Sequence, residues 1–227
     1  MFKNLLTSAV FAGVAVGVIA AVLQFWLVTP LLLEGELYES GARVHFAVDG
    51  STQSDAGHPA LFTDPMRDLM TIGFNMVTFT AFALFLAIGF ALTERGGHEV
   101  TARKGLIWGI AAFIAVQLAP AMGLPPELPG TVAADVELRQ IWWICTVLAT
   151  AVGLGLIAFG PTLAGIGGAA LIALPHIVGA PHLDTYFGVA APELSAHFAT
   201  ASLGTSAVAW ALLGLFTATL WVKFKDA

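Results

Sequence analysis

Charged side chains are scarce in this chain of 227 residues. They make up 11% of it, against about 25% in an average soluble domain, and hydrophobic residues make up 58%. No soluble core requires so deep a depletion of charge. The composition therefore predicts a polytopic membrane protein, an all-α helical bundle that crosses the bilayer several times.

Cysteine is scarcer still, with one residue, Cys145, inside an apolar run. A single cysteine excludes a disulfide framework within the chain and any cysteine cluster for zinc or iron–sulfur. The net charge of −6 argues against a nucleic-acid partner. The phosphate-binding pattern G-x-x-x-x-G-K-[ST] is absent, as are a Ser/His/Asp arrangement and a membrane-embedded H-E-x-x-H. We therefore expect a protein that is not an enzyme and holds no resident cofactor.

Apolar runs predict six transmembrane helices in a single transmembrane domain that covers residues 1–227. Their approximate ranges are 5–28, 69–92, 105–122, 141–159, 162–177 and 192–222. The first run is longer than the about 7–15 residues of a signal-peptide core, and it suffices to cross ~30 Å of hydrocarbon. Within it, Gly13 and Gly17 lie four apart on one face, which favours packing within the chain over a dimer face. Thr29-Pro30 ends this span, and residues 29–68 form a long outer loop.

The distribution of lysine and arginine orients the helices. Six spans put both termini on one side, and an excess of basic residues is expected on the cytoplasmic side. With cytoplasmic N- and C-termini, six of the nine basic residues lie inside: Lys3, Arg95, Arg103, Lys104, Lys223 and Lys225. Five spans are the alternative, in which the Gly/Ala-rich fifth run is not counted. That arrangement would move Lys223 and Lys225 outside, so we prefer six.

The same orientation places most acidic residues and histidines outside. Twelve of the fifteen acidic residues fall there: Glu34, Glu36, Glu39, Asp49, Asp55, Asp64, Asp68, Glu127, Asp135, Glu137, Asp184 and Glu193. So do five of the six histidines: His45, His58, His176, His182 and His197. The cytoplasmic bias of basic residues leaves acids outside by default, but it predicts nothing about histidine. An outer face rich in carboxylate and imidazole concentrates cations and offers ligands for divalent metals.

The candidate metal ligands surround the end of the fifth run. Residues 174–184 contain two prolines, which prevent an uninterrupted helix and let side chains several positions apart converge. The candidate ligands are His176, His182, Glu193, Glu34, Asp184 and His197. Glu193 and His197 are four apart at the start of the sixth span, hence on one helical face. Imidazole with carboxylate suits Co²⁺, Ni²⁺ or Zn²⁺, whereas the alternative for a boundary histidine such as His176 is a hydrogen-bonded structural role.

Three neutral polar residues inside the spans, Gln24, Asn75 and Gln117, are candidates for a transport path. The alternative is that they make helix–helix hydrogen bonds, as most such residues do. Gln24 and Gln117 lie in the outer halves of their spans, which is compatible with a lining role. His45 and His58 fall in the outer loop, where they are either loosely held metal collectors or solvated surface.

Several segments carry a family resemblance. They are Lys3-Asn4-Leu5-Leu6, Thr29-Pro30 with Glu34, Glu36 and Tyr38-Glu39, Leu-Pro-Pro-Glu-Leu-Pro-Gly at residues 124–130, Arg139-Gln140-Ile141-Trp142-Trp143, Leu174-Pro175-His176, Gly179-Ala180-Pro181-His182 and Pro192-Glu193-Leu194. Through them the chain resembles the CbtA family, proposed cobalt transporter subunits of bacteria. The resemblance implies a bacterial inner-membrane protein for cobalt uptake linked to cobalamin biosynthesis, with a small single-span partner, CbtB, that carries histidines. It also implies five spans rather than six.

Two hypotheses of function follow. In the first, the protein admits Co²⁺ (or Ni²⁺) from the outside through a mouth of histidine and carboxylate, driven by the membrane potential or by a partner. In the second, it is a non-transporting membrane scaffold or metal-delivery subunit that binds a small helical partner through small-residue faces. Haem or quinone binding, with His176 and His197 as the pair, is a third interpretation.

Overall fold

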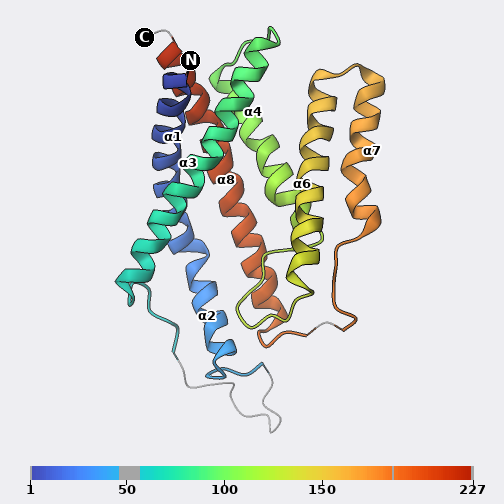
Figure 1. The fold of residues 1–227 in the computed structure, drawn as a ribbon. Helices are drawn as coiled ribbons and strands as arrows, with labels where there is room; N and C mark the ends of the chain where they lie inside the picture. The colour runs from blue at the N-terminus through green and yellow to red at the C-terminus, as the bar shows by residue number, and fades with distance from the viewer. Residues whose placement is uncertain (1, 46–56, 186, 226–227) are drawn as a thin grey trace. The chain divides into compact units, whose positions relative to one another are not determined.

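The computed structural model describes residues 2–45, 57–185 and 187–225, and these residues are mainly helical. The helices are α1 (Phe2–Leu27), α2 (Thr29–Glu39), α3 (Pro65–Arg95), α4 (Ala102–Phe113), the π-helix η1 (Ile114–Leu118), α5 (Ala119–Ala121), α6 (Val136–Phe159), α7 (Thr162–Val178) and α8 (Pro192–Lys225) (Figure 1). Across the described ranges, the β pairing amounts to an isolated antiparallel bridge between Thr131 and Gly188. The all-α prediction is therefore confirmed. Asp49 and Asp55, predicted to lie outside the membrane, fall outside the described residues.

Five helices among the described residues are long and apolar enough to cross a membrane. They are α1, α3, the continuous run Ala102–Ala121 that α4, η1 and α5 form together, α6 and α8. The remaining apolar helix, α7, has 17 residues, which is about 26 Å of helix against a hydrocarbon core of ~30 Å. The predicted fifth run is therefore a helix, but a short one. The number of spans, six or five, and their orientation stay predictions.

The outer loop predicted for residues 29–68 differs from the structure in its first part, because Thr29–Glu39 forms α2. Val28 alone separates α1 from α2, and its carbonyl accepts hydrogen bonds from the amides of Leu31 (3.1 Å) and Leu32 (3.0 Å). Pro30 lies in the first turn of α2, where its missing N–H has no intrahelical partner to lose. Thr29-Pro30 thus ends one helix and begins the next.

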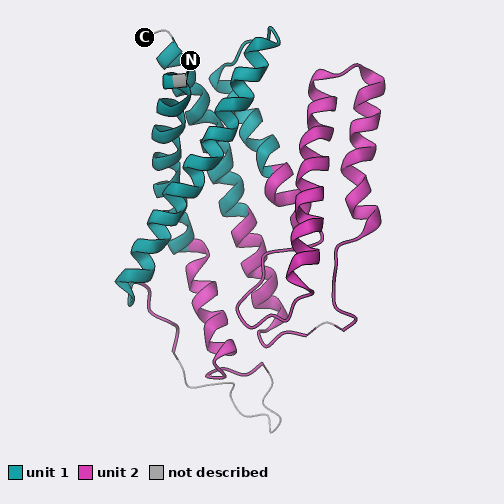
Figure 2. Cartoon of the chain, in the orientation of Figure 1, with its two compact units in different colours: residues 1–26, 62–113, 204–227 teal, residues 27–61, 114–203 magenta. Residues whose placement is uncertain are grey.

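The chain divides into two compact units (Figure 2). Unit 1 comprises residues 1–26, 62–113 and 204–227, and unit 2 comprises residues 27–61 and 114–203. Unit 1 therefore holds α1, α3, α4 and the C-terminal part of α8. Unit 2 holds α2, η1, α5, α6, α7 and the first turns of α8. The prediction of a single transmembrane domain stays a prediction.

In unit 1, glycines bring α1 into backbone contact with α3. A Cβ atom placed on Gly17 would lie 2.5 Å from the Cα atom of Met76, and one placed on Gly13 would meet the backbone of Thr80. Real Cβ atoms do not approach other atoms so closely, so any larger residue would force these helices apart. The prediction that Gly13 and Gly17 serve packing within the chain is confirmed.

Helices α4 and α8 meet in the same way within unit 1. A Cβ atom placed on Gly214 would lie 2.7 Å from the Cα atom of Gly109, and one placed on Gly109 would meet the carbonyl oxygen of Trp210. The Trp210 ring packs against Phe82 of α3, with ring centroids 4.5 Å apart. The C-terminal part of α8 is therefore held by backbone contact on one side and by an aromatic pair on another.

Both chain ends lie at the same end of unit 1. Phe11 of α1 and Phe224 of α8 have ring centroids 6.4 Å apart. Nearby, the Lys225 Nζ atom lies 3.1 Å from a carboxylate oxygen of Glu94, at the end of α3. This end therefore gathers residues that the sequence assigns to one side of the membrane. Which side it is stays a prediction.

Unit 2 contains a hydrophobic cluster that joins connecting segments to helices. Its buried members are Val28, Tyr38, Leu128, Ala190 and Phe198. Leu128 belongs to the Leu-Pro-Pro-Glu-Leu-Pro-Gly segment at residues 124–130 and is 3% exposed. Burial of this side chain, between prolines that restrict the backbone, holds this non-helical segment in place.

Helices α6 and α7 of unit 2 form a hairpin around Gly160-Pro161. They approach closely, because a Cβ atom placed on Gly153 would lie 2.6 Å from the carbonyl oxygen of Gly168. At the other end of the hairpin, the Trp142 Nε1–H group donates a buried hydrogen bond of 3.1 Å to the carbonyl oxygen of Pro175. The hairpin is therefore closed at both ends.

Candidate metal-binding and transport site

The stretch at residues 174–184 begins as helix and ends without regular structure. Helix α7 continues through Pro175 to Val178, so Pro175 does not interrupt it, contrary to the prediction for this residue. The helix ends at Gly179, whose φ of +88° disfavours residues with a side chain. Pro181 follows, and since proline cannot continue a helix, α7 does not extend past this point. Pro175 is tolerated because its missing N–H removes only one hydrogen bond from the end of the helix.

His176 lies in the last turn of α7 and is half-buried. Its ring packs edge-on against Trp142 of α6, with ring centroids 6.0 Å apart and an interplanar angle of 74°. Trp142 also donates to the carbonyl oxygen of the preceding residue, Pro175, so one side chain of α6 contacts both residues. The packing gives His176 a structural role, and its metal role stays a prediction.

The other four candidate ligands near the α7–α8 connection are exposed. His182 and Asp184 lie in the irregular segment after Gly179, and the His182 Nδ1 atom is 3.0 Å from the carbonyl oxygen of Leu183. Glu193 and His197 lie on the first turns of α8, with Glu193 in the first turn itself. A carboxylate there is stabilised by the positive end of the helix dipole.

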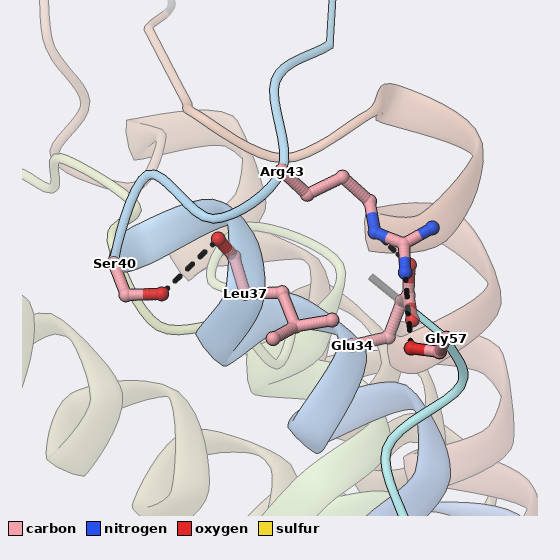
Figure 3. A network of polar contacts seen from close by, with 5 residues as sticks. All are labelled: Glu34, Leu37, Ser40, Arg43 and Gly57. Atoms are coloured by element: carbon pink, nitrogen blue, oxygen red, sulfur yellow. Dashed lines mark hydrogen bonds and ion pairs between the residues drawn. The ribbon is translucent and has the colours of Figure 1, made fainter. Parts of the chain in front are cut away.

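Glu34 is held in an ion pair that the sequence does not reveal. Its Oε1 atom lies 2.9 Å from the Arg43 Nε atom, and the two side chains are only 18% and 15% exposed (Figure 3). The Arg43 Nη2 group also donates to the carbonyl oxygen of Gly57 at 3.5 Å. The second carboxylate oxygen of Glu34 is buried, with no hydrogen-bond partner in the described part of the chain. Glu34 is therefore charge-compensated, with one oxygen still available.

The ion pair could not be predicted because the chain reverses between its partners. Residues after α2 turn at Gly41, which has a φ of +75°. That turn, rather than any helical spacing, returns Arg43 toward Glu34. A second pair joins Glu127 and Arg139 at 2.6 Å, again across a connection. The sequence offered only an indirect indication of these pairs, since Arg43 and Arg139 are two of the three arginines predicted to lie on an otherwise acidic outer side.

The six candidate ligands all lie in unit 2, but the structure does not gather them into one cage. Across residues 2–45, 57–185 and 187–225, no three side chains of histidine, cysteine, aspartate or glutamate are grouped so that they could hold a metal ion. The ligand set of His176, His182, Glu193, Glu34, Asp184 and His197 thus stays a prediction. In the structure these residues offer single ligands rather than a closed site.

The three path candidates have different surroundings. In unit 1, the Asn75 Nδ2 group donates to the Gln24 Oε1 atom at 2.9 Å and to the carbonyl oxygen of Thr71 at 2.8 Å. This is the helix–helix hydrogen bond that the alternative interpretation describes. In unit 2, Gln117 lies in the π-helix η1, and its Oε1 atom is buried with no partner among the described residues. The lining role of all three residues stays a prediction.

Comparison with known families identifies the protein's relatives. The sequence profile of CbtA, described as a probable cobalt transporter subunit, matches residues 2–222 of the 227-residue chain. The chain belongs to the CbtA family. This confirms the resemblance seen in the sequence, and with it a multi-pass membrane protein in metal transport. A CbtA protein is a transporter subunit, which is not an enzyme and which belongs to a larger complex. No curated protein and no solved structure gives a significant match to the chain.

Proposed function

We propose that this protein is the membrane-embedded subunit of a Co²⁺ uptake system in the bacterial cytoplasmic membrane, and that the ion supports cobalamin biosynthesis. The observation that carries the proposal is the CbtA match over residues 2–222. The ligand chemistry of unit 2 supports it, since Co²⁺ and Ni²⁺ both accept imidazole and carboxylate. A small single-span protein like CbtB is the proposed partner, because a subunit requires a complex.

The proposed mouth is a set of exposed ligands rather than a preformed cage. His182 and Asp184 lie on the irregular segment, and Glu193 and His197 lie on the first turns of α8. A transported ion has to leave as readily as it enters, which favours such single ligands over a tight site. His176 and Glu34, which are more buried, are the proposed inner ligands. Water or a histidine of the partner would complete the coordination.

Arg43 makes entry at Glu34 an exchange reaction. An incoming cation that binds the paired oxygen of this carboxylate takes the place of the guanidinium that lies 2.9 Å away. The buried second oxygen of Glu34 would gain a ligand in the same step. Removing one charge while adding another keeps the largely buried carboxylate compensated throughout, which lowers the electrostatic cost of the step.

Beyond the mouth, Gln117 is the proposed lining residue of unit 2, and Gln24 and Asn75 are proposed lining residues within unit 1. Neutral groups interact with a cation without trapping it, as a path requires. The inward membrane potential supplies about 2.3 kcal/mol per charge per 100 mV, so a divalent ion gains about twice that. A chain that lacks the phosphate-binding motif of many ATPases can draw on this source.

Cellular uptake of ⁵⁷Co tests the ligand assignment. We expect His182→Ala and His176→Ala to lower the initial rate several-fold at cobalt concentrations below saturation, because each removes one ligand. His98→Ala is the matched control, since His98 is an exposed histidine outside the ligand set. Uptake at the wild-type rate in both ligand variants, at equal membrane abundance, would exclude the assignment.

A non-transporting role as scaffold or metal-delivery subunit is the second candidate. It is favoured by the lack of a grouped three-ligand site among the described residues, together with the family's description as a subunit. Purified protein in liposomes separates the two functions. Entry of ⁵⁷Co without any partner favours transport, whereas binding without entry favours the delivery role.

A further inference from the structure

A π-helix interrupts the run Ala102–Ala121. η1 covers Ile114–Leu118, and Pro120 follows it within α5. In an α-helix, the ring of Pro120 would clash with the carbonyl group of Val116, and its missing N–H would leave that group without a donor. A wider turn before a proline eases such a clash, although it does not supply the N–H that proline lacks. A π-turn of this kind frequently marks a functional site.

Gln117 lies inside this turn. Its Oε1 atom is buried and has no hydrogen-bond partner among the described residues. An amide oxygen carries two lone pairs, and burying it without a partner is unfavourable in a membrane protein as elsewhere. The turn therefore presents one oxygen in need of a donor or a cation, the side-chain amide of Gln117. The missing N–H of Pro120 predicts a second, a backbone carbonyl in the preceding turn.

Helix α6 packs against η1 and α5 and offers a third oxygen. Its buried face carries two fully buried threonines, Thr146 and Thr150. The Thr146 hydroxyl donates to the carbonyl oxygen of Trp142 at 2.8 Å, as a helical threonine usually does. The Thr150 hydroxyl, one turn further, has no partner in the described part of the chain. The Thr146 hydroxyl is therefore already bonded, whereas the Thr150 hydroxyl still needs a partner.

Gln117 and Thr150 lie at a similar depth in unit 2. A Cβ atom placed on Gly123 would lie 2.7 Å from the Trp142 ring, which marks where the two segments meet. Gln117 is six residues before Gly123, and Thr150 is eight residues after Trp142. At about 1.5 Å per residue these separations are roughly 9 and 12 Å along segments that run in opposite directions (Figure 1). The free oxygens therefore fall within about one helical turn of each other in depth.

All of these oxygens are neutral, and neither residues 114–121 nor residues 141–159 contain a charged side chain. The desolvation cost of an ion rises with the square of its charge, so uncharged oxygens hold a divalent cation less readily than a monovalent one. A monovalent cation that prefers oxygen fits better. In secondary transporters, carbonyl groups released from broken helices coordinate Na⁺ in this manner. We propose that Gln117, Thr150 and the carbonyl released by Pro120 form a Na⁺-binding site in unit 2.

The site would supply the proposed transport with a coupling ion. Na⁺ moving inward down its gradient could drive Co²⁺ entry where the membrane potential alone does not suffice. That coupling role rests on the proposed function, whereas Na⁺ binding itself rests on the geometry of η1 and α6. The test is therefore a binding measurement first and a transport measurement second.

Thermal unfolding of the purified full-length protein, followed by tryptophan fluorescence, measures binding. NaCl replaces choline chloride at constant ionic strength, and a ligand that binds only the folded state raises Tm. We expect Na⁺ to raise Tm in the wild type and in Thr146→Val, the matched control whose hydroxyl is already bonded. The shift should fall at least about threefold in Thr150→Val and in Gln117→Leu, since each loses a ligand.

Equal responses of Thr146→Val and Thr150→Val, or no effect of Na⁺ over choline on the wild type, would overturn the site. The wild-type titration decides even where a variant does not fold. Uptake of ⁵⁷Co into proteoliposomes with and without a Na⁺ gradient then tests coupling. A Tm response to Na⁺ without any cobalt uptake would retain the site and reject the proposed function. Cobalt uptake with no Tm response to Na⁺ would retain the proposed function and reject the site.

Discussion

Unit 1 and unit 2 bury their apolar surfaces in different ways. The helices of unit 1 meet through glycine backbone, as at Gly17 and Gly109, and through a tilted aromatic pair. In unit 2 the α6–α7 hairpin also meets through glycine, at Gly153 and Gly168. The core of unit 2 is partly built from connections, since Leu128 and Ala190 lie outside its helices. Unit 2 also contains the π-helix, the ion pair of Glu34 and all six candidate metal ligands.

The difference has a physical reason. Helices satisfy their own backbone groups, so two of them can approach until only glycine fits between them. Irregular backbone cannot do so, and in a membrane protein it is tolerated where protein buries it or where it lines a water-filled space. In unit 2 the irregular segment after α7 carries His182 and Asp184, and the helix ends on either side of it carry His176, Glu193 and His197. We expect substitutions in unit 1 to act on folding and substitutions in unit 2 to act on ion handling as well.

The largest effect is expected for Gly109→Ala in unit 1. The new Cβ atom would meet the carbonyl oxygen of Trp210, a backbone atom that cannot move without shifting α8. We expect a loss of about 2–3 kcal/mol, measured as a lowered Tm and a reduced yield of monodisperse protein. Gly73→Ala is the control, because open space surrounds Gly73 in α3, and there alanine should gain up to about 1 kcal/mol. A wild-type Tm for Gly109→Ala would contradict the close packing of unit 1.

An intermediate effect is expected for Arg43→Ala in unit 2. It leaves the Glu34 carboxylate, which is 18% exposed, without its counter-charge. We expect a loss of about 2 kcal/mol, less than for a fully buried pair because water still reaches the carboxylate. Glu34→Gln in the same background should recover about half of it. The same Arg43→Ala variant should bind Co²⁺ more tightly in equilibrium dialysis, since the competing cation is gone.

A double-mutant cycle of Arg43→Ala and Glu34→Ala isolates the pair. A coupling free energy of about 1 kcal/mol or more is expected, because removing both charges leaves none uncompensated. Strictly additive losses would show that Glu34 and Arg43 do not interact in solution. Unit 2 would then lack the charge exchange proposed for its mouth.

The smallest effect is expected for Trp142→Phe. The change removes the hydrogen bond to the carbonyl oxygen of Pro175, which still accepts the Gly179 amide at 3.0 Å, so we expect a loss of about 1 kcal/mol. Hydrogen exchange at residues 176–179 should become faster, since the hairpin is closed at this end by that bond. Trp143→Phe, at the exposed neighbouring position, is the control and should leave exchange unchanged. Equal exchange in both variants would show that Trp142 does not position His176.

Much of the helical architecture could be predicted from the sequence. Long apolar runs predict helices wherever they occur, and the predicted runs 141–159 and 162–177 lie close to α6 and α7. The four-residue spacing of Gly13 and Gly17 predicted their packing correctly, because spacing on a helix determines which residues share a face. Helix α2 was missed because Pro30 suits a first turn as well as a helix end.

The candidate site was less predictable. Residue types identified its ligands, but their partners depend on chain reversals and on contacts between distant segments. Arg43 returns to Glu34 through a turn at Gly41, and Asn75 bonds Gln24 across 51 positions. Thr146 and Thr150 look alike in sequence, and only their surroundings distinguish a bonded hydroxyl from one without a partner.

By itself, the sequence determined that the chain is helical, that it belongs in a membrane and that it resembles cobalt transporter subunits. Composition and the length of apolar runs suffice for the first two conclusions, because these depend on the transfer of side chains and backbone from water into lipid. The resemblance rests instead on particular segments, such as Leu-Pro-Pro-Glu-Leu-Pro-Gly at residues 124–130. Only the tertiary structure decided that Glu34 is paired, that His176 packs on Trp142 and that Gln117 lies in a π-turn. Each of these features depends on which segments pack against one another, and hydropathy does not specify that packing.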